Sequence, residues 1–170
     1  MGLDLGLLIV RVVVGLIFAA HGAQKAFGWW SGPGFTGWTG VMGKMGLRPA
    51  PLWSAVSTSA ELVGGVALAL GLLTPLAAAA LVAQGTVIVL RAHWAAGFWS
   101  SNRGYEFPLS LLGGAAAILF TGPGAWALDD LLPVGFLYEP LVRWGVAVIA
   151  LVGALIVLAL PKPPPAAQAG

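Results

Sequence analysis

Apolar residues in this chain gather into five long runs, which polar or glycine-rich segments separate. A helix needs roughly 20 apolar residues to cross the hydrocarbon core of a bilayer, and the runs reach or approach that length. They lie at about residues 3–20, 52–73, 75–90, 107–121 and 141–160. We therefore predict an all-α fold, a polytopic bundle of membrane helices that forms a single domain over residues 1–160. Residues 161–170 are rich in proline and alanine, which predicts a disordered tail.

Two details of the pattern refine this fold. Only Thr74 and Pro75 separate the second run from the third, and proline suits the first turn of a helix, so these runs should form a tight antiparallel hairpin. Between the first two runs, four apolar residues recur at spacings of three and four, namely Phe35, Trp38, Met42 and Met45. This period predicts a short helix on the membrane surface, although the glycines of the same segment favour an irregular loop.

Composition narrows the classes of protein further. Hydrophobic residues make up 59% of the chain and charged residues 8%, whereas about a quarter of the residues in a soluble domain are charged. The net charge of +2 is too small and too scattered for a nucleic-acid-binding surface, so we expect no nucleic-acid partner. The absence of cysteine excludes disulfides, thiol chemistry, iron–sulfur clusters and cysteine-ligated metal sites. Any redox role therefore depends on a carrier that is not covalently attached.

Basic residues predict the orientation of the helices. If the five runs alternate in direction, six basic side chains lie on one side of the bilayer: Lys25, Lys44, Arg48, Arg91, Arg103 and Lys162. The opposite side has Arg143 among four acidic residues. Because basic residues are enriched on the cytoplasmic side, the amino terminus is predicted to lie outside and the carboxyl terminus in the cytoplasm.

Seven polar side chains lie at the predicted cytoplasmic ends of three runs. His21, Gln24 and Lys25 are spaced i, i+3 and i+4, so they share one face of the first helix. The other four are Arg91 and His93, which close the third run, and Tyr105 and Glu106, which precede the fourth. Together they could line a pocket that opens to the interface. Lys25 and Arg91 have an alternative interpretation, since long basic side chains also extend to lipid phosphates.

Two charged residues, Arg11 and Glu61, lie inside apolar runs, where a charge needs a partner or a function. Counting at 1.5 Å per residue from the cytoplasmic side puts the two side chains nearly level. We therefore expect a buried Arg11–Glu61 ion pair, with Gly64 and Gly65 allowing close approach of the two backbones. The alternative is a functional role, in which Glu61 binds a ligand or carries a proton.

Four strings of residues occur in order along the chain: HGAQKAFGWW, AELVGGVALALGLLTP, HWAAGFW followed by GYEFPLSLL, and GPGAWALD. In order and spacing, over about residues 5–130, they resemble the DoxX family of small bacterial membrane proteins. The resemblance implies a core of four membrane helices in the bacterial cytoplasmic membrane. The family's characteristic polar positions are matched by His21, Lys25, Glu61, His93 and Glu106. The chain departs from the family at Thr74-Pro75, where Thr-Arg is common, and in its fifth, C-terminal transmembrane helix.

The resemblance leaves three functions open. One is a quinone-interacting membrane subunit of an oxidoreductase, since some relatives resemble the membrane subunit of a thiosulfate:quinone oxidoreductase. The second is a non-catalytic scaffold for a soluble redox or oxidative-stress enzyme. The third is a small proton-coupled transporter that uses Glu61. The partners we expect are the lipid bilayer and either a soluble redox enzyme or further copies of the chain.

The first function assigns roles to the polar residues. A quinone would contact His21, Gln24, Lys25, Arg91, His93 and Tyr105. Glu61 or Glu106 would act as the acid that protonates it. Haem is a lesser alternative, because bis-His ligation needs two imidazoles and His21 and His93 are the two in the chain.

Overall fold

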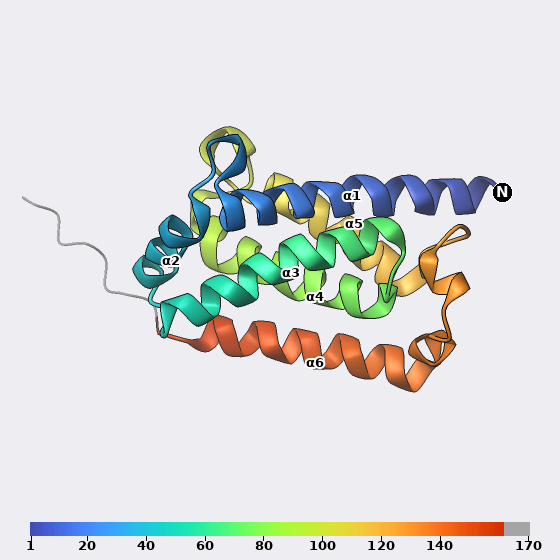
Figure 1. Cartoon of the computed structure of the whole chain (residues 1–170). Helices are drawn as coiled ribbons and strands as arrows, with labels where there is room; N and C mark the ends of the chain where they lie inside the picture. The colour runs from blue at the N-terminus through green and yellow to red at the C-terminus, as the bar shows by residue number, and fades with distance from the viewer. Residues whose placement is uncertain (162–170) are drawn as a thin grey trace, which may run out of the picture.

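Six α-helices build the part of the protein that the computed structural model describes, residues 1–161 (Figure 1). Five of them form the bundle: α1 (Gly2–Phe27), α3 (Ala50–Leu70), α4 (Thr74–Val87), α5 (Glu106–Thr121) and α6 (Pro140–Ala159). The sixth, α2 (Gly34–Lys44), is short and lies across one end. The predicted all-α bundle is confirmed, with a fifth long helix after the first four. Apart from Pro161, the predicted tail lies outside the described residues.

Successive long helices run in opposite directions, so the bundle has two ends. At the amino-terminal end, Met1, the α3–α4 turn and the segment 122–139 lie together (Figure 1, right). At the other end, which we call the α2 end, lie α2, the segment 94–105 and the end of α6 (Figure 1, left). The alternation assumed for the orientation is thus present. That the α2 end faces the cytoplasm stays a prediction.

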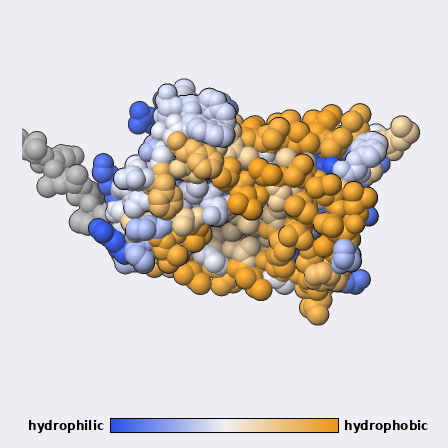
Figure 2. Space-filling model, viewed as in Figure 1, coloured by the Kyte–Doolittle hydropathy of each residue, from blue (hydrophilic) through white to orange (hydrophobic). Residues whose placement is uncertain are grey.

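Length and hydropathy make four of the described helices candidates for spanning a membrane. They are Gly2–Phe27, Ala50–Leu70, Thr74–Ala96 and Pro140–Ala159. The third of these is α4 continued by a π-helical turn, Ile88–His93, and a short 3-10 turn. The remaining helix, α5, has 16 residues and is apolar but shorter. Large apolar side chains cover the sides of the bundle (Figure 2), as expected for a surface in contact with lipid.

The core lies where α1, α3, α4 and α5 meet. Leu68, Leu81 and Ile118 are fully buried there, with Phe18 of α1 packed against them. α1 and α3 are in close backbone contact at Gly15, Gly22 and Gly65. A Cβ atom on Gly65 would lie 2.5 Å from the Ala19 backbone nitrogen, so only glycine permits this spacing.

The glycine-rich segment between α1 and α3 forms the predicted short helix rather than an irregular loop. Met42, which is 4% exposed, packs with Leu47 and Ala50 where α2 meets the start of α3. Trp38 is partly buried against the same cluster. The apolar face of α2 therefore anchors the helix across the end of the bundle, despite the low helix propensity of its glycines.

Asp129 fixes the predicted α3–α4 hairpin from a distant part of the chain. Its carboxylate accepts hydrogen bonds from the Leu73 amide at 2.6 Å, from the Thr74 amide at 2.8 Å and from the Tyr138 hydroxyl at 2.5 Å. Burial alone would raise the pKa of Asp129, but the hydrogen bonds from Tyr138, Thr74 and Leu73 outweigh it and lower the pKa below the ordinary value. Burial and the neighbouring carboxylate raise the pKa of Tyr138. The hairpin therefore depends on an ionised Asp129.

Candidate functional site

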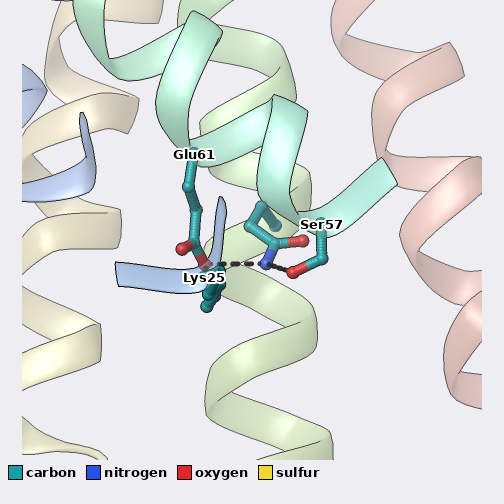
Figure 3. Close-up of polar contacts among 4 residues, drawn as sticks. Lys25, Ser57 and Glu61 are labelled. Carbon is teal, nitrogen blue, oxygen red and sulfur yellow. Dashed lines mark hydrogen bonds and ion pairs between the residues drawn. The ribbon is translucent and has the colours of Figure 1, made fainter. Parts of the chain in front are cut away.

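Glu61 lies at the centre of a buried polar cluster near the α2 end (Figure 3). Its Oε1 atom is 2.5 Å from Lys25 Nζ of α1 and accepts a hydrogen bond from Gln84 Nε2 of α4 at 2.9 Å. Gln84 Nε2 also donates to Ser57 Oγ at 2.8 Å. Trp38 of α2 covers the ammonium group, with Lys25 Nζ 4.3 Å from its ring centre. Four helices therefore contribute to one cluster.

The expected Arg11–Glu61 ion pair is wrong. Arg11 lies at the amino-terminal end, where Nη1 donates to the Pro123 carbonyl at 2.7 Å and Nη2 donates to the Trp126 carbonyl at 2.6 Å. The cause is the relative shift of α1 and α3 along their axes, which we call their stagger. Gly22 of α1 lies directly against Leu62 of α3, so Lys25 rather than Arg11 is level with Glu61.

The depth count failed because α1 does not end with its apolar run. It continues to Phe27 through the polar string HGAQKAF, so its carboxyl end is not level with the start of α3. Arg11 lies fourteen residues before Lys25, which is roughly 21 Å along the helix. Arg11 instead holds the segment that follows α5 against the bundle.

A cavity of about 520 Å³ opens beside the Lys25–Glu61 pair. Its polar lining residues are His21, Lys25, Trp38, Glu61, His93, Ser100 and Arg103. Its apolar walls include Phe18, Ile88, Phe107, Pro108 and Leu111. This size and this mixture of apolar walls with a few polar groups are typical of a small-molecule site.

The two histidines of the chain both line the cavity. His21 extends from α1 near Phe107, with ring centres 6.1 Å apart. His93 ends the π-helical turn, and its Nδ1 atom is 2.7 Å from the Arg103 carbonyl oxygen. The cavity thus combines His21, Lys25, Glu61 and His93, four of the residues predicted for the site.

The other four predicted residues have contacts elsewhere. Arg91 donates to the Met45 carbonyl and to the last carbonyls of α6, including Val157 at 2.8 Å. Gln24 lies against Gly32. Tyr105 stacks on Trp94 with ring centres 4.9 Å apart, and a Glu106 oxygen accepts a hydrogen bond from the Ser100 amide at 2.9 Å. Arg91 and His93 diverge because side chains two residues apart on a helix do not share a face.

Sequence reasoning missed Gln84 and Ser57, which complete the cluster around Glu61. A signal for Gln84 was present, since it is an isolated amide in the apolar run PLAAAALVAQGTVIVL. A polar group in such a run needs a hydrogen-bonding partner. Ser57 gave no comparable signal, because serine occurs often in membrane helices where two backbones pack closely.

Comparisons with known proteins find a family model and a relative that this chain is similar to. The family model described as DoxX matches residues 6–94, which include Lys25, Glu61, Gln84 and His93. The uncharacterized membrane protein Rv3486 of Mycobacterium tuberculosis (strain ATCC 25618 / H37Rv) is 30% identical over 133 residues, covering 72% of this chain and 78% of that protein. No solved structure matches the chain.

Proposed function

The chain belongs to the DoxX family of membrane proteins, and on this premise we propose that its cavity binds the head group of a quinone. The observation that carries the proposal is the position of the cavity. The cavity has a volume of about 520 Å³, and its lining combines aromatic and aliphatic side chains with the buried Lys25–Glu61 pair. A quinone ring needs such a combination, because its faces are apolar and its two carbonyl groups are polar.

The polar residues of the cavity suit the chemistry of this ligand. His21 and Lys25 carry N–H groups that can donate hydrogen bonds to a ligand carbonyl. Glu61 is the candidate acid that lines the cavity. Glu106, the other candidate acid, is bound instead to the Ser100 amide. Reduction of a quinone to a hydroquinone consumes two electrons and two protons. A chain without cysteine has no thiol to supply the electrons, so the proposal includes a soluble redox partner at the α2 end.

A titration with a short-chain benzoquinone tests the proposal. We expect saturable binding to the purified full chain, and binding about tenfold weaker in His21→Ala, as for the loss of one hydrogen bond to a ligand. Lys44→Ala is the control, because Lys44 lies on α2 and not among the lining residues. The variants should be compared only at matched thermal stability.

The titration also separates the proposal from the other functions. A scaffold for a soluble enzyme needs no ligand in the cavity. If the wild-type chain shows no saturable binding, or if His21→Ala and His93→Ala both bind as tightly as wild type, the quinone site is refuted and the scaffold becomes the better explanation.

A further inference from the structure

Only one of the two carboxylate oxygens of Glu61 accepts hydrogen bonds within residues 1–161. Oε1 accepts hydrogen bonds from Lys25 and Gln84, whereas Oε2 is buried and has no hydrogen-bond partner within residues 1–161. In Figure 3 this second oxygen points away from Ser57. Glu61 is 1% exposed and lines the cavity, so a ligand in the cavity is the natural source of a donor for Oε2.

His93 presents a second acceptor. Its Nδ1 atom lies 2.7 Å from the Arg103 carbonyl oxygen, and because a carbonyl only accepts hydrogen bonds, Nδ1 must carry the proton. In a neutral imidazole the other nitrogen, Nε2, is then an acceptor. Glu61 Oε2 is therefore an unpaired acceptor, and His93 Nε2 in this tautomer is a second acceptor on a residue that lines the cavity.

We propose that the cavity selects the reduced, hydroxyl-bearing form of its ligand, a hydroquinone, over the quinone itself. This inference rests on the proposed function and adds the preferred redox state. A hydroquinone has two hydroxyl groups that donate to Glu61 Oε2 and His93 Nε2. A quinone has only carbonyl acceptors, which can accept hydrogen bonds from His21 and Lys25 but leave Glu61 Oε2 and His93 Nε2 unpaired. Sites that hydrogen-bond a hydroxyl discriminate strongly against analogues that lack it.

Gln84 acts in this scheme as a positioning residue. Its amide nitrogen donates to both Glu61 Oε1 and Ser57 Oγ, which occupies both of its N–H groups. Together with Lys25 it holds Oε1 toward α1 and α4, and this orientation leaves Oε2 for the ligand. Glu61 is the specificity-determining residue that the ligand touches.

The experiment compares three probes on the purified full chain under anaerobic conditions. They are a short-chain benzoquinone, its hydroquinone and the dimethyl ether of that hydroquinone. Wild type should bind the hydroquinone at least about tenfold tighter than either of the others. In Glu61→Gln the acceptor becomes an amide that also donates, so the preference should disappear or reverse. Gln84→Leu should keep the fold and lower the hydroquinone-to-quinone affinity ratio severalfold, whereas Lys44→Ala should leave the ratio unchanged.

Each outcome has a separate meaning. Equal affinity of wild type for hydroquinone and quinone overturns the inference and leaves the quinone site intact. Absence of binding by all three probes overturns the proposed function itself. If Glu61→Gln does not fold, the Gln84→Leu ratio decides, and an unchanged ratio there refutes the positioning role. A purely structural role for Gln84 would lower stability without changing the ratio.

Discussion

Lys25 and Glu61 form an ion pair at the α2 end. Glu61 is 1% exposed, and its partner's ammonium group is enclosed by α2 through Trp38. An unpaired charge in a membrane interior costs roughly 2.5 to 3.5 kcal/mol on insertion scales. Each of the two helices contributes one charge to the pair, and packing the helices side by side gives each of these charges a partner, which avoids this cost.

A double-mutant cycle tests this dependence. Lys25→Leu or Glu61→Leu alone should lower the free energy of unfolding by about 3 to 5 kcal/mol, because each leaves a buried charge without its partner. The double variant should lose less than the sum of the two single variants. Unfolding in detergent measures all four proteins. A cycle with Arg11→Leu in place of Lys25→Leu is the control and should be additive, since Arg11 binds carbonyls at the opposite end. Strict additivity for Lys25 and Glu61 would contradict the pairing.

Asp129 makes the α3–α4 hairpin sensitive to acid. Its pKa is lowered in the folded state, because the hydrogen bonds from Tyr138, Thr74 and Leu73 outweigh the effect of burial. A lowered pKa stabilises the folded state at pH values above the ordinary value of 3.8 and loses that contribution as the pH falls through the lower, folded-state pKa. We therefore expect the folded protein to be more stable at neutral pH than in acid.

Thermal unfolding at pH 7 and below pH 4 measures this effect. Asp129→Asn should lower stability by roughly 1 to 3 kcal/mol at pH 7 and flatten the loss of stability in acid. Asp130→Asn is a matched control, because Asp130 is the adjacent and exposed carboxylate. Equal acid sensitivity of the Asp129→Asn variant and wild type would assign the effect to other groups.

Among the elements, the spacing of apolar residues was a good guide to the helices and a poor guide to their ends. The five long helices and α2 follow the runs and the period of three and four. The end of α1 does not, because helix propensity carries it seven residues beyond the apolar run to Phe27. The relative height of α1 and α3 depends on which side chains interlock between them, and that information is not contained in either run alone.

The close contact of α1 and α3 gives a prediction at the same scale. Gly65→Ala places a methyl group 2.5 Å from the Ala19 nitrogen, so the helices must separate, at a cost of about 1 to 3 kcal/mol. Gly113→Ala is the control, because a Cβ on this α5 residue meets nothing within 4 Å. In a helix the control should be neutral or up to about 1 kcal/mol more stable. Thermal unfolding in one detergent should show that Gly65→Ala is less stable than Gly113→Ala. An equal change in stability for the two variants would contradict the tight interface.

At the scale of the whole molecule, the distribution of charge predicts orientation. The α2 end has Lys44, Arg48 and Arg103, whereas the amino-terminal end has Asp4, Asp129 and Asp130. The positive-inside rule therefore predicts a cytoplasmic α2 end, with α6 ending there too. A reporter of compartment fused at the carboxyl terminus should give the cytoplasmic signal. The same reporter fused within the segment 122–139 should give the external one, and the reverse pattern would refute the orientation.

The candidate site was predictable in part because several helices end at the same end of the bundle. His21, Lys25 and His93 lie near helix ends, so the alternation of the runs was enough to bring them together. Glu61 joined them only through the stagger of α1 and α3. Gln84 and Arg91 lie seven residues apart on the same continuous helix, yet Gln84 turns to Glu61 and Arg91 to α6. The π-helical turn between them changes the angular spacing, and no simple helical period in the sequence predicts it.

Arg11 has a consequence for how the chain is made. Its carbonyl acceptor Pro123 lies 112 residues further along the chain, beyond α5. Synthesis at about 5 to 20 residues per second needs roughly 6 to 22 s to reach that point. During this interval α1 contains a cation without its final acceptors, so α1 makes its final contacts only after α5 has been synthesised. Arg11 therefore ties the final position of α1 to the completion of α5.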